Sequence, residues 1–169
     1  FLNVSVGISA DAMINTERSQ KRRLGMVAYA LTITQKLFGI QPAEFKITAD
    51  GEVHHFQAAD VLCANSGIVG VSRFNVKPDV ALDDGEIGIF VIRARSTLDY
   101  LIGIWNGLTG RAPQARNIQA LRVSESVGVE PETPLPKQAD GEALGRGGFK
   151  ADVVPHAIKV IVAPAKEEG

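Results

Sequence analysis

The tripeptide Asp-Gly-Glu occurs three times in the chain, at residues 50–52, 84–86 and 140–142. Asp and Gly tolerate positive φ, so each copy is first of all a candidate for a tight turn between strands. A carboxylate on a stiff turn can also do chemistry, because it can accept a proton from a hydroxyl group or bind a hard cation. The residue types therefore indicate two kinds of site, and the surrounding sequence must distinguish the copies.

The second copy lies in the acidic loop LDDGEIG, residues 82–88. An aspartate beside turn carbonyls is a usual arrangement around Mg²⁺, for which one carboxylate with carbonyls and waters is sufficient. The alternative is an Asx turn that leads into a strand, and the residues alone favour this alternative.

The third copy lies in QADGEALG, residues 138–145. Glu142 follows the turn directly, so we expect a stiff main chain there, and its carboxylate is a candidate acceptor for the proton of a hydroxyl group. The alternative is a solvated glutamate beside a turn, which the motif by itself favours.

Several common site signatures are missing from the sequence, which contains no GxGxxG, no GxxxxGK[ST] and no GxSxG. His54 and His55 are adjacent on an expected strand, so they point to opposite faces and cannot bind one ion together. The single cysteine, Cys63, lies in an apolar run. We therefore expect no disulfide, no zinc site and a buried, inert thiol in a reducing compartment.

The composition is that of a globular domain, with 169 residues of which 45% are hydrophobic and 22% charged, and a net charge of −1. This balance gives no field that recruits nucleic acid, so we expect no nucleic-acid partner. No apolar run is long enough to cross a bilayer, and the start lacks the pattern of a signal peptide. The chain opens without Met in what reads as mid-strand, so we expect it to be part of a longer protein.

The elements that must position these residues are mostly strands. Apolar–polar alternation predicts a strand over residues 2–8 with one buried face. A hairpin is expected over 44–58, buried strands are expected at 60–65 and 87–93, and a further hairpin is expected at Asp140-Gly141. The remaining strands are expected at residues 117–125, 126–130, 149–154 and 156–164.

Helical spacing of apolar residues predicts one helix over residues 24–38 and a second that presents Leu98–Leu108. Ser96 and Asp99 form a capping-box-like start for the second helix. In all we expect about eight to ten strands, separated by turns rather than by regular helices. This pattern predicts a mainly β fold, an antiparallel β-sandwich with inserted helices over residues 1–163, followed by a solvated tail at 164–169.

Taken in order, several motifs along the chain form a recognisable series. They are N-x-S-x-G-x-x-x-DA at residues 3–12, LGMVAY at 24–29, CANSGIVG at 63–70, KPDVALDDGEIGIFVI at 77–92, ADGEALG at 139–145 and AIKVIVAP at 157–164. The series resembles the C-terminal half of the bacterial diacylglycerol-kinase-like lipid kinases, a group that includes diacylglycerol, sphingosine and ceramide kinases. The resemblance covers essentially the whole chain.

The resemblance implies the two-domain fold shared with the NAD kinases, of which this chain supplies the C-terminal sandwich. The N-terminal domain of such an enzyme carries a GGDGT motif that holds ATP, and this chain has no such motif. The implied function is ATP-dependent phosphorylation of a lipid hydroxyl such as that of diacylglycerol, with the isolated fragment inactive.

The resemblance also assigns roles to the Asp-Gly-Glu copies. Glu142 is the implied proton acceptor for the lipid hydroxyl. Magnesium is the implied metal, bound by Asp84 and by the main-chain oxygens of Ala81 and Glu86. The copy at 50–52 has no implied role beyond its hairpin. The last position of the magnesium loop usually carries an uncharged residue, so the carboxylate of Glu86 can change the ion's coordination or bind outside the loop.

The implied partners are the lipid substrate, ATP and the chain's own N-terminal domain, in the cytoplasm or peripherally at the inner membrane face. The sequence leaves open whether the protein forms a homodimer. A basic run, Arg18 with residues 21–23, can bind anionic headgroups at about 1 kcal/mol per charge, although such runs are more often solvated loops.

The alternatives to the lipid-kinase function are a non-catalytic lipid- or protein-binding module of a degenerate kinase, and a domain of a soluble-substrate kinase like the NAD kinases. The ADGEALG pattern argues against the soluble-substrate alternative.

Overall fold

The computed structural model describes residues 1–10, 42–65, 68–69, 72–73, 84–94, 96, 99 and 117–159. These residues form mostly β structure, as predicted. The strands are β1 (Asn3–Gly7), β2 (Ala43–Ala49), β3 (Glu52–Ala58), β4 (Asp60–Ala64), β5 (Ile68–Val69), β6 (Ser72–Arg73), β7 (Ile87–Ile92), β8 (Ile118–Val123), β9 (Ser126–Pro131), β10 (Pro136–Ala139), β11 (Glu142–Arg146) and β12 (Phe149–Asp152).

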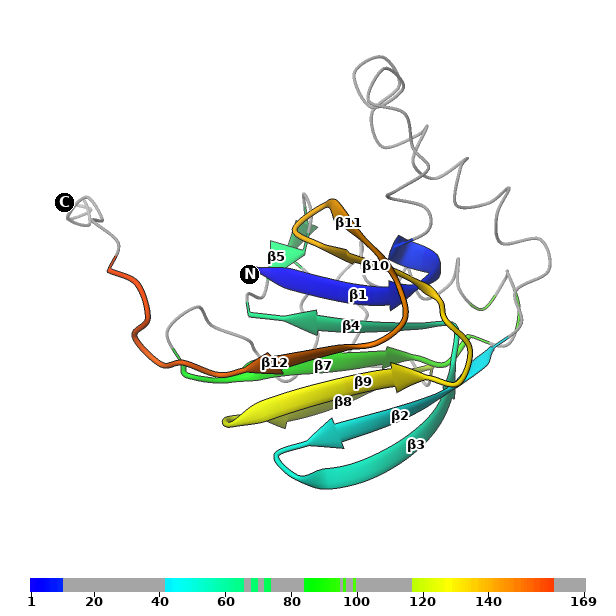
Figure 1. The fold of residues 1–169 in the computed structure, drawn as a ribbon, viewed down its shortest axis with the longest axis horizontal. Helices are drawn as coiled ribbons and strands as arrows, with labels where there is room; N and C mark the ends of the chain where they lie inside the picture. The colour runs from blue at the N-terminus through cyan, green and yellow to red at the C-terminus, as the bar shows by residue number, and fades with distance from the viewer. Residues whose placement is uncertain are drawn as a thin grey trace, which may run out of the picture.

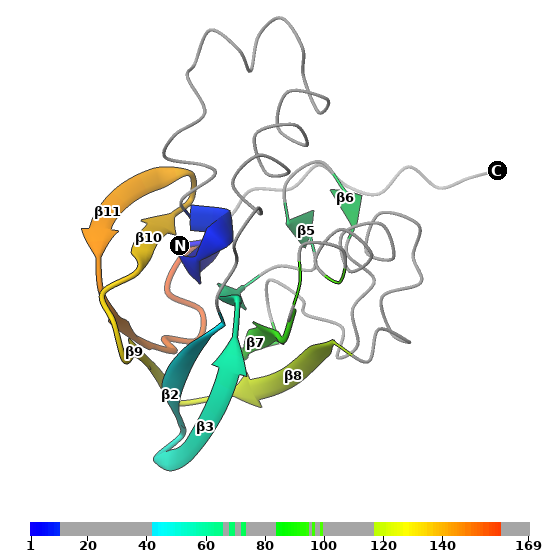
Figure 2. The same cartoon turned by 90° about the vertical axis from the view of Figure 1, so that its right-hand side faces the viewer.

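Two antiparallel sheets stack face to face (Figure 1). The larger sheet has six strands in the order β11-β10-β1-β4-β7-β8, and the smaller has four in the order β12-β9-β2-β3. A separate ribbon pairs β5 with β6. Figure 2, turned by 90°, shows that β10 and β11 bend round to the side on which β9 of the smaller sheet lies. The antiparallel sandwich predicted from the sequence is confirmed for the described residues.

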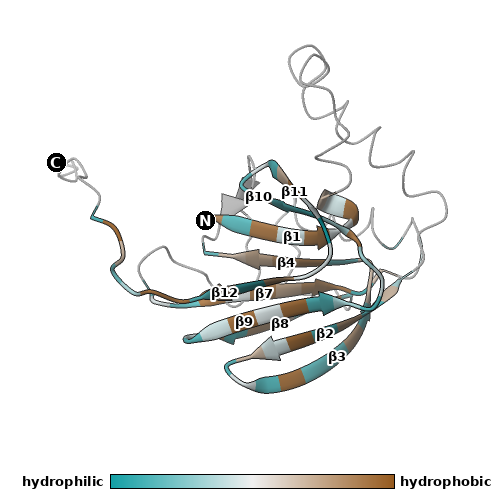
Figure 3. Ribbon diagram, in the orientation of Figure 1, coloured by the Kyte–Doolittle hydropathy of each residue, from teal (hydrophilic) through white to brown (hydrophobic). Residues whose placement is uncertain are grey.

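The core lies between the two sheets and is built from β-branched and aromatic side chains. Phe45 and Ile47 of β2 are fully buried against Ile89 and Val91 of β7 in one cluster. Strand β3 at the edge of the smaller sheet alternates polar and apolar residues, whereas β7 in the larger sheet is apolar along nearly its whole length (Figure 3). The difference arises because β7 contributes to a buried cluster on each face, with Ile89 and Val91 on one side and Phe90 on the other.

Strand β1 departs from the prediction of one buried face. Val4 and Val6 are buried as expected, but Ser5 is also only 1% exposed and Gly7 is buried on the opposite face. The alternation predicted an exposed face because serine is usually solvated. Here its hydroxyl is hydrogen-bonded inside the protein, to Gln138 and to Ser9, and these bonds offset the loss of water on the polar face.

Two of the three Asp-Gly-Glu copies are true hairpin tips. Asp50 and Gly51 have φ of 45° and 85°, and Asp140 and Gly141 have φ of 49° and 87°. These positive values are those of a two-residue turn that matches the twist of the flanking strands. The middle copy is different, because Gly85 alone has a positive φ, 72°, and the segment leads into β7 without reversing a strand.

Three further predictions have definite outcomes. The described residues contain twelve strands, more than the eight to ten expected, because the short β5 and β6 were not predicted. The strand expected from residue 156 does not begin there, since His156 has φ of 56° and lies in a turn. Ser96 Oγ accepts the N–H of Asp99 at 3.2 Å, which is the Ser96 half of the predicted capping box.

The helix predicted at 24–38, nearly all of the helix predicted through Leu108, and the basic run at 18–23 lie outside the described residues. Within the described ranges, no helix combines the length and the apolar character needed to cross a membrane.

Candidate functional site

All three Asp-Gly-Glu copies lie at the same end of the sandwich, on the left in Figure 1. Register places the second and third copies there: Asn3 pairs with Ala64, Ala64 pairs with Gly88, and the N–H of Asp140 donates to the carbonyl of Asn3 at 3.0 Å. The Asp140 turn and the start of β7 therefore lie at the same end of the strands of the larger sheet, with β1 and β4 between them. Four strand intervals separate β11 from β7, about 19 Å along the sheet.

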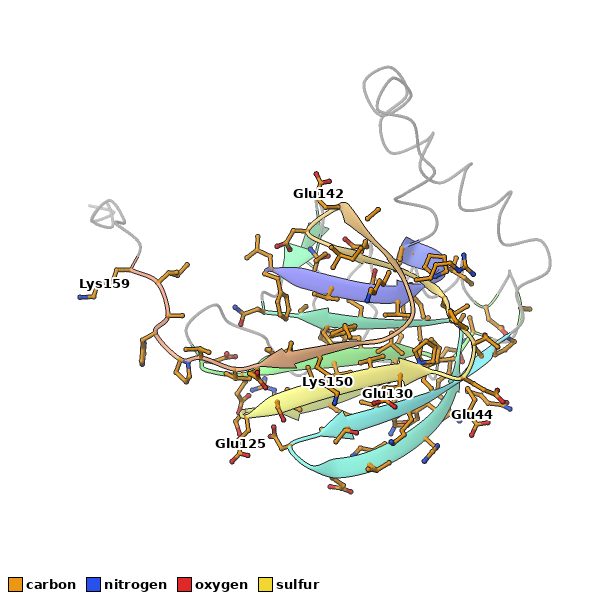
Figure 4. All side chains as sticks on the ribbon, in the orientation of Figure 1. Glu44, Glu125, Glu130, Glu142, Lys150 and Lys159 are labelled. Atoms are coloured by element: carbon orange, nitrogen blue, oxygen red, sulfur yellow. The ribbon has the colours of Figure 1, made fainter. Side chains whose placement is uncertain are left out.

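Glu142 is the first residue of β11 and pairs with Ala139 across the hairpin. Its side chain is exposed and points away from the sheet at the top of Figure 4. Within the described part of the chain it has no hydrogen-bond or ion-pair partner, so its carboxylate is open to an incoming hydroxyl group. The turn and the exposure agree with the candidate role, but they equally describe a solvated glutamate.

The residue two before Glu142 fixes the turn to the first strand. One carboxylate oxygen of Asp140 accepts the main-chain N–H groups of Leu2 at 2.9 Å and Asn3 at 2.8 Å. A charged acceptor makes stronger hydrogen bonds than a neutral one. The main chain that carries Glu142 is therefore attached to the start of β1.

The buried side chain of Gln138 makes a second attachment. Its Nε2 donates to Asn3 Oδ1 at 3.0 Å and to Ser5 Oγ at 2.9 Å, while its Oε1 accepts the N–H of Gly141 at 2.8 Å. The contributions of Gln138 and Asp140 were not predicted from the sequence. The available signal was the polar alternation of Asn3 and Ser5 on an expected strand, since these are the two side chains that Gln138 contacts.

The Asp84 loop forms the Asx turn that the residues favoured. Asp84 Oδ1 accepts the N–H of Glu86 at 2.9 Å, around Gly85 in the left-handed region. Asp84 is exposed at the protein surface. Ala81, the third residue expected at this site, lies outside the described residues.

The carboxylate of Glu86 is directed away from the loop. It forms an ion pair with Arg122 on the neighbouring strand β8, and both side chains are 35% exposed. This contact accounts for a charged residue at a position where the resemblance expects an uncharged one, because the charge is neutralised outside the loop. The main-chain oxygen of Glu86, the atom expected to bind metal, is not involved in that pair.

The donor set at the Asp84 loop fits a hard cation in kind, since it offers an exposed carboxylate and turn carbonyls. No cluster of three or more His, Cys, Asp or Glu side chains suited to a metal ion occurs in the described ranges. His54 and His55 instead lie singly beside Glu52 and Glu44, at 3.7 and 3.8 Å.

The first copy serves as a structural tie. The carboxylate of Asp50 accepts the main-chain N–H groups of Ser124, Glu125 and Ser126, each at 2.9 Å. These hydrogen bonds, that from Ser124 first, hold the pKa of the Asp50 carboxyl below its usual value. The hairpin at 50–52 therefore anchors the turn between β8 and β9, which is more than the plain tip that was expected.

Cys63 is fully buried in the core between the sheets, as predicted. Burial disfavours the charged thiolate and raises the pKa of the thiol well above its usual range. The thiol is therefore a packing residue with no part in the candidate site.

Comparison with known proteins identifies the class. A family model described as "YegS C-terminal NAD kinase beta sandwich-like domain" matches residues 3–162. The chain therefore belongs to this family of C-terminal sandwich domains, which confirms the resemblance drawn from the motifs.

Individual relatives agree with the family match. The chain is 25% identical over 166 residues, 97% of its length, to the "Probable lipid kinase YegS-like" of Shewanella frigidimarina (strain NCIMB 400), of which it covers 52%. It also resembles a crystal structure of a "putative diacylglycerol kinase" from Bacillus anthracis str. Sterne, with a TM-score of 0.64 at 22% identity, covering 89% of this chain and 49% of that one. A second diacylglycerol kinase structure from the same strain gives 0.59 at 21% identity, with 88% and 48% covered. The chain thus spans about half the length of these relatives, and the structures support the fold alone.

Proposed function

We propose that this chain is the C-terminal domain of an ATP-dependent lipid kinase, in which Glu142 accepts the proton of a lipid hydroxyl such as that of diacylglycerol. Two observations together support the proposal: the chain belongs to the YegS C-terminal family, and Glu142 sits exposed on a turn fixed to β1 by Asp140 and Gln138.

The proposed reaction is a phosphoryl transfer. As the lipid oxygen bonds to the γ-phosphorus of ATP, its proton passes to the Glu142 carboxylate, and the bond from the γ-phosphorus to the bridging oxygen breaks to release ADP. Such a reaction needs alignment and charge neutralisation more than covalent help from the protein. The groups that hold ATP belong to the proposed N-terminal half, so the isolated chain should be inactive.

For the magnesium site we propose Asp84 with the main-chain oxygens of Ala81 and Glu86. A magnesium ion held there would offset negative charge and keep the loop before β7 in one conformation. Strands β7 and β11 lie about 19 Å apart along the sheet, so the proposed role of the ion does not require it to share a phosphoryl oxygen with Glu142. We therefore propose that the ion serves to hold the loop before β7 in one conformation.

The test uses the chain joined to its native N-terminal half and measures diacylglycerol phosphorylation. Glu142→Gln should lower turnover by about a hundredfold or more, the range for loss of a positioned acid–base group. Glu125→Gln is the matched control, because Glu125 is also an exposed glutamate at the same end of the sandwich and should retain full turnover. Turnover of Glu142→Gln within a few-fold of the parent would remove Glu142 from the role.

A second candidate is a module that binds lipid or protein without catalysis. The observation that favours it is the exposure of Glu142, which has no partner in the described part of the chain. Vesicle flotation with the same phosphorylation assay separates the candidates, since a module would bind vesicles without turnover. A soluble-substrate enzyme like the NAD kinases should stay unbound at moderate salt, where surface charges are screened.

The remaining parts of the proposal follow from the substrate. A lipid hydroxyl is presented at a membrane surface, so we propose a cytoplasmic protein with peripheral contact at the inner face. Fractionation of cells expressing the full-length protein would test this, with recovery only from the wash-resistant membrane fraction contradicting it.

A further inference from the structure

We propose that Gln138 is a positioning residue for Glu142, because its buried amide holds the turn from which the candidate base projects. The inference rests on the proposed function of Glu142. It deepens that function by naming the group that determines where the carboxylate stands.

The first support is the cost of burying Gln138. The residue is 1% exposed, and an amide removed from water is costly unless its polar atoms are hydrogen-bonded. Gln138 lies directly opposite Ser5 in the β1–β10 register, and its Nε2 donates to Ser5 Oγ and to Asn3 Oδ1. The nitrogen end of the amide is thereby held by two side chains of one neighbouring strand.

The second support is the contact at the other end of the same amide. Gln138 Oε1 accepts the N–H of Gly141, the residue immediately before Glu142. Gly141 adopts φ of 87°, a conformation that an L side chain rarely adopts. One planar side chain thus connects a central strand of the sheet to the second residue of the turn.

The third support is that Glu142 has little else to hold it. Its side chain is exposed and has no partner among the residues that the structure describes. Its position therefore depends on its main chain, and a misplacement of about 1 Å can lower a rate by about a hundredfold. Gln138 holds the N–H of Gly141, and Asp140 holds the preceding residue to the start of β1.

The test is a double-mutant cycle on the chain joined to its native N-terminal half. Gln138→Met, which keeps the shape of the side chain, should lower kcat about tenfold or more and leave KM for ATP unchanged. In a Glu142→Gln background the same change should cost less than about twofold, since the base it positions is gone. An equal loss of kcat in both backgrounds would overturn the proposal, because it would mean damage unrelated to Glu142.

Two further variants keep the cycle interpretable. Lys137→Met is the matched control, since Lys137 is the adjacent residue on β10 and bonds to the Gly148 carbonyl at 2.8 Å, away from the turn. It should retain kcat. Ser5→Ala removes one hydrogen-bond partner of Gln138 with little change in volume, and should give a smaller loss in the same direction. If Gln138→Met does not fold, Ser5→Ala in the two backgrounds decides.

A measurement without turnover separates this inference from the proposed function. Amide hydrogen exchange on this chain should become faster at Gly141 in Gln138→Met, while Ile47 in the core keeps its protection. Unchanged exchange at Gly141 would refute the proposal that Gln138 holds the turn, whatever the kcat of the variant. Full turnover of Glu142→Gln would instead refute the base, and with it the positioning role, even if exchange at Gly141 responds.

Discussion

Asp140 and Asn3 are joined reciprocally, although 137 positions of sequence separate them. The carboxylate of Asp140 accepts the N–H of Asn3 at 2.8 Å, and the carbonyl of Asn3 accepts the N–H of Asp140 at 3.0 Å. The start of β1 and the β10–β11 turn are therefore one structural unit. A substitution at the turn should therefore change the free energy of unfolding as well as the proposed turnover.

The Asp140 contacts predict a graded response to substitution. Asp140→Ala removes the acceptor for two N–H groups and places alanine at a φ of 49°, so the free energy of unfolding should fall by about 1–2 kcal/mol. Asp140→Asn keeps an acceptor oxygen and tolerates positive φ, so it should lose less. Urea unfolding of the chain measures both. Equal losses for the two variants would contradict this account.

The Asp84 loop predicts a magnesium effect that needs no turnover. If the proposed ion binds, thermal unfolding of the chain should shift upward as Mg²⁺ is added, with about 2.7 kcal/mol of stabilisation at a hundredfold excess over Kd. Asp84→Asn should abolish most of the shift, because it replaces the anionic ligand. Glu86→Gln should keep the shift, because its carboxylate pairs with Arg122 outside the loop. The reverse result would mean that Glu86 supplies the ligand.

The glycine of the N-x-S-x-G motif predicts a steric effect. A Cβ at Gly7 would lie 2.5 Å from the Ala59 carbonyl oxygen, and φ there is 127°. Gly7→Ala should therefore cost about 3 kcal/mol or more of unfolding free energy. Gly128→Ala is the matched strand control, since its nearest contact would be an ordinary 3.7 Å to Thr48. Denaturant unfolding should find it within about 1 kcal/mol of the parent.

The hydrogen bonds to Asp50 predict a dependence of stability on pH. The pKa of its carboxyl is lower in the folded protein than the usual value of 3.8. The stability that the ionised group contributes is therefore present above that value and is lost as pH falls through the folded pKa. Asp50→Asn should be less stable than the parent at pH 7, and the difference should narrow near pH 3. A gap of the same size at both pH values would exclude ionisation as its cause.

The hairpins could be predicted from sequence because Asp-Gly at residues 50–51 and 140–141 carries its own conformational preference. Buried strands such as β7 were equally predictable, since a run of β-branched and aromatic residues has few alternatives. These are local signals, and they were sufficient to locate the turn that carries Glu142 and the loop that carries Asp84.

The hydrogen bonds that Gln138 makes to Ser5 and Gly141 could not be predicted in the same way. Ser5 and Gln138 are of residue types that are mostly exposed, and only the pairing of β1 with β10 makes their burial favourable. That pairing joins opposite ends of the chain, and local patterns carry no information about it. The partner of Glu86 was hidden for the same reason, because Arg122 reaches it only through the β7–β8 register.

Strand β11 ends the larger sheet in the described part of the chain, and every one of its residues is exposed. An open edge of this kind invites fibre growth by addition of a strand from another molecule. Here Gly145 has φ of 81°, and the β10–β11 register shifts between Pro136 and Gln138, so the ladder is bent beyond its first residues. The β10–β11 turn is therefore exposed, while the bent strand β11 is a poor template for the addition of a strand from another molecule.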